Sequence, residues 1–260
     1  MSTTRAPCPQ CDRGPRDTAL AVTTDERGTV SYCHRCGYVE YTAAERRIVR
    51  DAPIRTTRRA EPLEWSTRAE SIWRRTQPLR GTLGEVYLQH RGCMLPPRDS
   101  HLRYLPGDDR YPPSLCAAIT DIVTGKPISL HFTRLATDGK GKAGTDRDKL
   151  LLAGHRKRGG CIRLFPDEAI SYALGIAEGI ESALSAAHAY TPVWATIDAG
   201  NLAAFPVLAG IESLVIFHDA DDRGIEAAAE CAARWSAAHK EVLLVSPSRA
   251  QTDINDEVTA

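Results

Sequence analysis

Two closely spaced cysteine pairs near the start of the chain constrain its fold more than any other feature. Cys8 and Cys11 form the first pair, and Cys33 and Cys36 form the second. Each Cys-x-x-Cys spacing lets two thiolates reach one ion from a single tight turn, and two such pairs complete a tetrahedral site. Two disulfides are the alternative, but the reducing compartment expected for a chain without a secretory signal disfavours them. The spacing therefore predicts a structural zinc ion held by four cysteines.

The segment between the pairs predicts a hairpin that brings them together. Residues 19–22 and 29–32 are short strands in this interpretation, with a turn between them. Gly37 follows the second pair, where a left-handed residue commonly closes such a turn. A unit of about 40 residues cannot bury an adequate core alone, so zinc would supply folding free energy. We expect a zinc-binding ribbon over residues 1–43. The remaining cysteines are expected to be small buried side chains: Cys93, Cys116, Cys161 and Cys231.

Composition places the 260-residue chain among ordinary globular proteins, since it is 42% hydrophobic and 25% charged. Residues 1–160 carry 28 basic and 18 acidic side chains, whereas residues 161–260 carry 5 and 15. This division favours a polyanion as partner of the first part and divalent cations as ligands of the second. No apolar run approaches membrane-spanning length, and the first residues lack the apolar core of a secretory signal. We expect a cytoplasmic protein with no membrane partner.

A basic linker is expected at residues 44–62, which contain six arginines and few apolar residues. It is either a solvated tether or a contact for a phosphate backbone. Helical pieces are predicted between residues 65 and 88, divided by a proline and a glycine. A β-hairpin follows, with strands over 117–122 and 128–134. These elements form a basic α+β subdomain over residues 63–168.

A run rich in glycine and lysine after this hairpin has only a superficial similarity to a Walker loop. Gly139 and Gly144 have the right spacing, but Thr145 and Asp146 occupy the positions of the required lysine and hydroxyl residue. The run therefore predicts no helicase motor. A second basic run, residues 155–160, is either a surface turn or a phosphate contact.

Strands and helices alternate in residues 169–260, as is typical of a parallel sheet covered by helices. Strands are expected over 172–177, 193–197, 214–218 and 242–246, with helices over 179–190 and 224–239 and a short helical piece around Leu202. In such sheets, sites lie beyond the carboxyl ends of the strands. The expected fold class is α/β, consisting of the zinc ribbon, the linker, the α+β subdomain and a Rossmann-like domain with a parallel sheet.

Three carboxylates stand at those strand ends. Glu178 follows the first strand, and Asp219 and Asp221 follow the third. Carboxylate oxygens that converge on one sheet edge suit Mg²⁺ or Mn²⁺. An acid at a helix N-terminus can instead serve only the helix dipole, and we interpret Glu181 in this way.

The acidic motifs carry a family resemblance. Glu178-Gly179 together with Asp219-x-Asp221-x-x-Gly224 resembles the signature of the Toprim domain, which DnaG-type primases, topoisomerases and some nucleases share. A type IA topoisomerase needs large additional domains for which the chain has no room.

Three further stretches resemble primases of phages and mobile elements. Residues 195–202 are similar to the stretch between their acidic motifs, and residues 253–256 resemble their closing Lys-Asp-Ala-Asn-Asp motif with Thr252 at the lysine position. Residues 28–33 are similar to their template-reading zinc ribbon. The resemblance covers nearly the whole chain and gives residues 169–260 the role of a Toprim catalytic subdomain.

The resemblance implies a DNA primase, an enzyme that makes short RNA primers from NTPs on single-stranded DNA. It implies two-metal nucleotidyl transfer, with Mg²⁺ or Mn²⁺ held by Asp219, Asp221 and Asp253. Glu178 is either a further ligand or the base that takes the hydroxyl proton. The zinc ribbon would read unstacked template bases.

Candidate residues for the incoming triphosphate come from the basic subdomain: His131, Arg134 and Lys142. A separate replicative helicase is the expected protein partner. A Toprim nuclease is the alternative enzyme, because it uses the same acids with water as nucleophile. A zinc-dependent nucleic-acid-binding adaptor with an inert Toprim fold is the alternative without catalysis.

Overall fold

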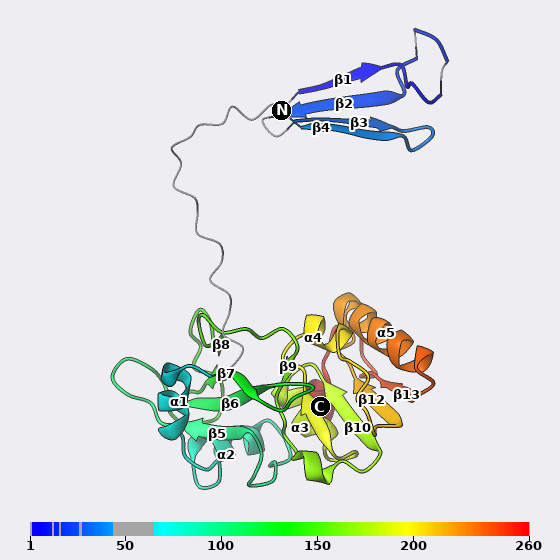
Figure 1. Cartoon of the computed structure of the whole chain (residues 1–260). Coiled ribbons are helices and arrows are strands. Elements are labelled where there is room, and N and C mark those ends of the chain that lie inside the picture. Colours follow the sequence, from blue (N-terminus) through cyan, green and yellow to red (C-terminus); the bar gives the residue numbers. More distant parts are fainter. Residues whose placement is uncertain (1, 12, 16, 26–27, 44–64, 260) are drawn as a thin grey trace. The chain divides into compact units, whose positions relative to one another are not determined.

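The chain divides into two units, Met1–Thr57 and Arg58–Ala260. The computed structural model describes residues 2–11, 13–15, 17–25, 28–43 and 65–259, and Figure 1 draws the remainder as a thin trace. The predicted basic linker, residues 44–62, lies outside the described residues.

The smaller unit contains a four-stranded antiparallel sheet in the order β1-β2-β3-β4 (Figure 1). The pairing of β2 with β3 confirms the predicted hairpin, whereas β1 and β4 are additional strands. Leu20 pairs with both Ala6 and Cys33, so the end of β1, the start of β2 and the end of β3 meet. This arrangement brings the two cysteine pairs to one end of the sheet. The strands are β1 (Ser2–Ala6), β2 (Leu20–Asp25), β3 (Gly28–Cys33) and β4 (Val39–Ala43).

The larger unit begins with two short helices and an antiparallel sheet in the order β5-β6-β7-β8, with β9 paired to β6. The hydroxyl of Ser66 accepts a hydrogen bond from the backbone N–H of Ala69 and so caps α1. Pro78 and Gly81 lie between the helices, as predicted. The elements are α1 (Thr67–Arg74), α2 (Leu83–His90), β5 (Leu102–Leu105), β6 (Ser114–Asp121), β7 (Pro127–Arg134), β8 (Lys149–Leu151) and β9 (Gly160–Cys161).

The second half of this unit is a parallel sheet in the order β11-β10-β12-β13, which confirms the predicted alternation (Figure 1). The expected strand over 193–197 is shorter, because Ile197 turns the chain with a φ of 77°. The elements are a 3-10 turn η1 (Asp167–Ala169), β10 (Ala173–Ala177), α3 (Ile180–Ala186), β11 (Val193–Ala195), α4 (Ala199–Ala203), β12 (Ser213–Phe217), α5 (Asp222–Ala237), β13 (Glu241–Val245) and α6 (Ile254–Thr259).

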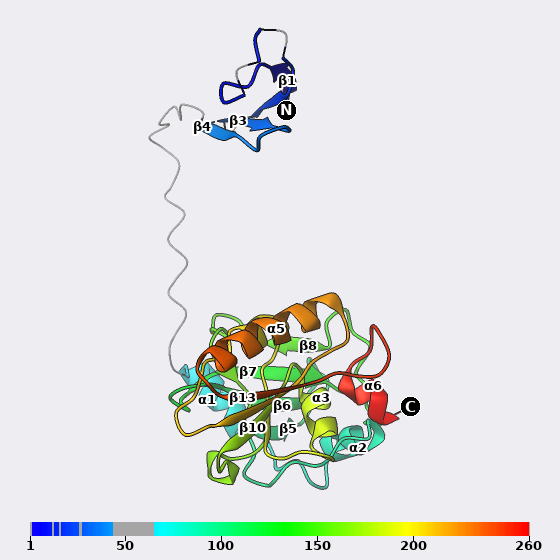
Figure 2. The same cartoon turned by 90° about the vertical axis from the view of Figure 1, so that its right-hand side faces the viewer.

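Helices α3 and α5 cover opposite faces of the parallel sheet (Figure 2). Leu184 of α3 belongs to the same buried cluster as Phe217, whereas Trp235 of α5 belongs to the cluster that contains Ile216. Neighbouring residues of β12 point to opposite faces, which explains this separation.

The two sheets share a core. The cluster on the α3 side also contains Ile119 of β6, and Ile162 exchanges two backbone hydrogen bonds with Ala195 of β11. The basic subdomain and the parallel sheet are therefore packed as one unit.

The four cysteines outside the pairs are buried, as expected for small apolar side chains: Cys93, Cys116, Cys161 and Cys231. Across the described residues, no helix has the length and apolar character needed to cross a membrane.

Candidate functional site

The four paired cysteines gather at one end of the small sheet. The Sγ atoms of Cys8, Cys11, Cys33 and Cys36 all lie within 4.8 Å of one another. The Cys8–Cys36 and Cys11–Cys33 sulfurs are 3.7 and 3.8 Å apart, which excludes a disulfide bond between them. Sulfurs about 3.8 Å apart are what tetrahedral zinc with bonds of about 2.3 Å requires. The donor set therefore fits zinc.

Backbone geometry shapes this end of the sheet. Gly37 has a φ of 74°, and its N–H donates to the Cys33 carbonyl at 3.0 Å, so the residue closes the second turn as predicted. Arg35 and Asp17 form a two-bond ion pair at 3.0 and 3.1 Å, which ties the two cysteine-bearing loops together.

The predicted acids lie along the carboxyl edge of the parallel sheet. Strands β10 and β12 are neighbours with Ala177 opposite Phe217, so Glu178 and Asp219 follow adjacent strand ends. Asp221 lies two residues further and caps α5 by accepting a hydrogen bond from the Gly224 N–H at 2.7 Å.

Asp253 reaches this edge through the backbone. The Gln251 N–H donates to the Ala220 carbonyl at 2.8 Å, and the Ala220 N–H donates to the Thr252 carbonyl at 2.9 Å. Asp253 directly precedes α6, and its carboxylate accepts from the Asp256 N–H at 2.8 Å. The closing motif is thus fastened to the turn that carries the two aspartates.

Asp219 has the environment of an unsatisfied ligand. Its Oδ1 atom is buried and has no hydrogen-bond partner in the described part of the chain. Two effects together raise the pKa of Asp219 to about 7. Burial is the larger effect, and the negative charges of Glu178, Asp253 and Asp221 add to it. A buried oxygen without a donor, in a field of other carboxylates, fits a bound cation.

Glu178 shares this field. Burial raises its pKa, the charge of Arg223 opposes the shift, and the charges of Asp221 and Asp198 reinforce it. The carboxylates do not form one tight cluster, however. Among the described residues, only the cysteines form a group of three or more acidic, histidine or cysteine ligands within 4.8 Å. The acids thus share an edge without converging on a single ion position.

A buried carboxylate beside this edge was interpreted too simply from the sequence. Glu181 is 4% exposed, and Lys149 Nζ lies 3.2 Å from its Oε2 atom. Lys142 Nζ lies 3.8 Å from Oε1, which also accepts the Tyr87 hydroxyl at 2.9 Å. Burial alone would raise the pKa of Glu181, but Lys149, Lys142 and the Tyr87 hydroxyl lower it to about 2. Glu181 therefore holds two cations near the acids, which is more than a helix-dipole role.

Sequence analysis also missed Lys149 and Lys157. Lys149 is the first residue of β8, and its positive charge opposes the rise in the pKa of Asp219. Lys157 forms an ion pair with Asp198, whose charge in turn acts on Glu178. The basic run at 155–160 was the available signal for Lys157, but the sequence left its two interpretations open.

Two of the three predicted nucleotide-binding residues, His131 and Arg134, lie on opposite faces of β7. His131 lies in β7 and is 8% exposed; burial lowers its pKa to about 4, so it is neutral near pH 7. Arg134 reaches Thr145 Oγ1 at 3.5 Å, and it follows Phe132 on the face of β7 opposite to His131. Lys142 stands beside Glu181. A hollow of about 260 Å³ adjoins Lys142, lined by Tyr87, His90, Arg91, Lys140, Gly141 and Lys142.

Two family profiles match the chain. Residues 173–260 match the Toprim domain family, and residues 64–164 match a domain of unknown function, DUF7146. No curated protein matches.

Two solved structures are similar to the chain. The primase of Aquifex aeolicus, described by its zinc-binding and RNA polymerase domains, aligns with a TM-score of 0.51 and 14% identity over 99% of this chain and 75% of that one. A DNA primase domain from Pseudomonas aeruginosa aligns with a TM-score of 0.40 and 15% identity, over 70% and 56% of the two chains. At such identity the Aquifex similarity establishes the fold.

Proposed function

We propose that this chain, a Toprim protein with a primase-type fold, makes short RNA primers on single-stranded DNA. The four-cysteine ribbon would bind zinc and read the template, and the edge formed by Glu178, Asp219, Asp221 and Asp253 would hold Mg²⁺ or Mn²⁺. A separate replicative helicase would supply the unwound template. We further propose the subdivision into a ribbon at 1–43, a linker at 44–62, a basic subdomain at 63–168 and a Toprim subdomain at 169–260.

The buried, unpartnered Oδ1 of Asp219 is the single observation that carries the proposal. A carboxylate that served only folding would be expected to have a donor, because burying an unsatisfied polar oxygen costs free energy. Divalent ions bound there would activate a 3′-hydroxyl and neutralise the departing pyrophosphate. Glu178 would accept the hydroxyl proton, since its raised pKa favours proton uptake.

Cations beside the acids support a triphosphate as substrate. Lys142 and Lys149 are paired with Glu181 but remain 37% and 48% exposed, so both ammonium groups can reach a ligand. Lys157 is 50% exposed at its contact with Asp198. Phosphate oxygens favour such charge-assisted contacts. The hollow beside Lys142 adds Arg91, whose Nε atom is buried without a partner in the described residues. Burial lowers the pKa of His131 to about 4, so it would offer a phosphate a hydrogen bond but no positive charge.

One face of the ribbon supports contact with unstacked bases. Val30 pairs with Tyr41, and Tyr32 pairs with Val39, so the four side chains lie on one face of β3 and β4. All four are at least 43% exposed. Exposed aromatic side chains on a sheet are suitable platforms for base stacking.

The test is incubation of labelled single-stranded DNA with NTPs and Mg²⁺ or Mn²⁺. New short RNA supports the primase, shortened DNA supports the nuclease, and neither product supports the adaptor. Asp219→Asn should abolish synthesis. Asp109→Asn, the same change at an exposed residue of the loop between β5 and β6, should leave synthesis intact.

A further inference from the structure

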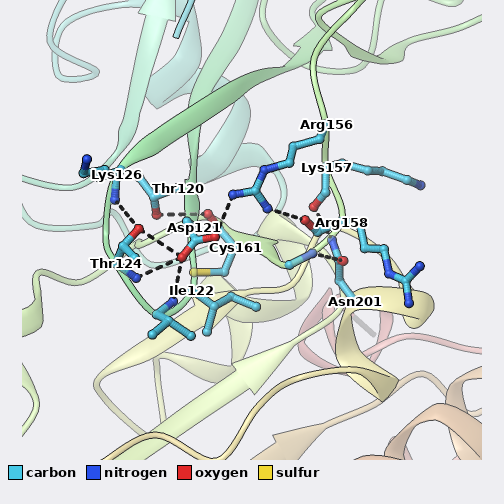
Figure 3. Close-up of polar contacts among 12 residues, drawn as sticks. Thr120, Asp121, Ile122, Thr124, Lys126, Arg156, Lys157, Arg158, Cys161 and Asn201 are labelled. Carbon is cyan, nitrogen blue, oxygen red and sulfur yellow. Dashed lines mark hydrogen bonds and ion pairs between the residues drawn. The ribbon is translucent and has the colours of Figure 1, made fainter. Parts of the chain in front are cut away.

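The basic loop at residues 155–160 is held by side chains from β6 and α4 (Figure 3). Arg156 forms an ion pair with Asp121 at the end of β6, with an N–O distance of 2.7 Å. The same guanidinium donates to the Arg158 carbonyl at 2.8 Å. Gly159 has a φ of 71°, which favours glycine at this position. The loop is therefore a defined structure and not a loosely held surface turn.

Asn201 of α4 holds this loop from the parallel sheet. Its side chain is almost completely buried, with the residue 3% exposed. Its Oδ1 atom accepts the Gly159 N–H at 3.1 Å, and its Nδ2 atom donates to the Lys157 carbonyl at 3.0 Å. The oxygen and the nitrogen of this one side-chain amide thus both form hydrogen bonds with the backbone of the loop (Figure 3).

The same short helix also holds the Lys157 side chain. Asp198 pairs with Lys157 Nζ through Oδ2, while its Oδ1 accepts the Asn201 N–H at 2.9 Å. Asp198 lies just beyond β11, which is adjacent to β10 and therefore to Glu178. Asn201 and Asp198 together fix the backbone and the ammonium group of Lys157 beside the acidic edge.

We infer that Asn201 is a positioning residue, which sets the loop so that the Lys157 ammonium stands where a substrate phosphate would lie. The inference rests on the proposed function for the identity of the substrate, a nucleoside triphosphate. Asn201 touches no reacting atom in this assignment and acts only through Lys157. A purely structural asparagine would stabilise the fold and leave substrate affinity unchanged.

The kinetic test compares wild type, Asn201→Ala, Lys157→Met and the double variant in primer synthesis. Losing a fixed contact with bound substrate raises KM and leaves kcat nearly unchanged, and we expect about a tenfold rise in KM for NTP in Asn201→Ala. The double variant should have the KM of Lys157→Met alone, because Asn201 has nothing left to position. Rises in KM that multiply in the double variant would overturn the inference.

A readout without catalysis separates this inference from the proposed function. In Asn201→Ala, trypsin should cut faster after Arg156, Lys157 or Arg158, and binding of Mn²⁺–ATP should weaken by the same factor as KM rises. Unchanged cleavage and unchanged Mn²⁺–ATP affinity would refute the inference even if primers are made. Both effects in a protein that makes no primers would uphold the inference and reject the proposed function.

Two further variants control for folding. Thr196→Val removes a buried hydrogen bond to the Ala177 carbonyl without touching the loop, so it should lower the melting temperature and leave KM unchanged. Asn201→Asp keeps the side-chain shape and an acceptor for Gly159 while losing the donor to the Lys157 carbonyl. If Asn201→Ala does not fold, Asn201→Asp should also raise KM, because it sets an acceptor against the Lys157 carbonyl oxygen, and it should add nothing to the KM of Lys157→Met. A further rise in that double variant would contradict the assignment.

Discussion

Lys149 Nζ lies 3.2 Å from Glu181 Oε2, and this ion pair joins β8 of the antiparallel sheet to α3 of the Toprim domain. Because the carboxylate is buried, the lysine compensates a charge that would otherwise be costly inside the protein. The pair therefore stabilises the larger unit. It also holds the Lys149 ammonium group, which would contact a substrate phosphate in the proposed function.

Replacing this lysine should lower the stability and make it less sensitive to acid. The folded pKa of Glu181, about 2, lies below its unfolded value, so its ion pairs stabilise the fold above about pH 4 and lose this effect as the pH falls toward 2. Lys149→Met should lower the free energy of unfolding at pH 7 by about 1–3 kcal/mol, since Lys149 is half exposed and partly screened. The further loss on acidification should be smaller than in wild type, because the folded pKa of Glu181 moves toward its unfolded value. Denaturant titrations from pH 3 to 7 measure both effects, and a profile equal to that of wild type would contradict them.

Asp219 should show the opposite pH dependence in the metal-free protein. Its folded pKa, about 7, lies above its unfolded value, so its contribution to stability is present below about pH 4 and is lost as the pH rises through 7. At pH 8, Asp219→Asn should therefore stabilise the metal-free protein by about 1 kcal/mol or more, a rise in melting temperature of about 2–4 °C per kcal/mol.

Without metal at pH 8, Asp219→Asn is expected to be more stable than wild type, and Mn²⁺ should reverse this order. Mn²⁺ should raise the melting temperature of wild type at pH 8, much less at pH 5, and hardly at all in Asp219→Asn. Thermal unfolding with and without EDTA gives the comparison. Equal stabilisation of both proteins by Mn²⁺ would mean that the ion binds elsewhere.

The helix-capping role of Asp221 can be separated experimentally from its proposed role in metal binding. Asp221→Asn should keep the cap on the Gly224 N–H, whereas Asp221→Ala should lose it at a cost of about 1 kcal/mol. Both variants should lose primer synthesis, because neither supplies a carboxylate. Synthesis that survived in Asp221→Asn would restrict this residue to its capping role.

Zinc binding should require the four paired cysteines and none of the other cysteines. Cys33→Ser should release zinc, measured by elemental analysis, and impair template-dependent initiation. Cys116→Ala, at a buried cysteine of the larger unit, should retain the metal. Unfolding of the larger unit should be unchanged in Cys33→Ser, because that unit has its own buried core. A wild-type protein that contained no zinc would remove the premise.

Template binding should depend on the exposed face of the ribbon. Tyr32→Ala should weaken binding of single-stranded DNA by about 1 kcal/mol or more, that is, about fivefold. Tyr172→Ala, at a more exposed tyrosine of the larger unit, is the control and should change little. The slope of affinity against salt should be the same in all three proteins, because no charge is altered. Equal weakening by both substitutions would argue against a ribbon-specific contact.

The sequence allowed the parallel sheet to be predicted because its strands are continuous apolar runs that alternate with helices. Its acids could be placed at one edge, since each follows a strand end. Short strands such as β8 and β9 carry too few residues for a periodic pattern. The role of Glu181 was missed because its partner Lys149 lies 32 residues earlier in the chain, and only the fold brings them together. Strand alternation predicted that Arg134 and His131 lie on opposite faces of their strand. It did not predict which of the two faces lies toward the acids.

Gly224 has a further mechanical consequence. A Cβ atom at this position would lie 2.5 Å from the carbonyl oxygen of Asp219, so the start of α5 presses directly against the turn that carries the acids. Because Asp221 also caps this helix, we expect the turn and the first turn of the sixteen-residue helix to shift together. A displacement at the start of α5 would then reach both aspartates.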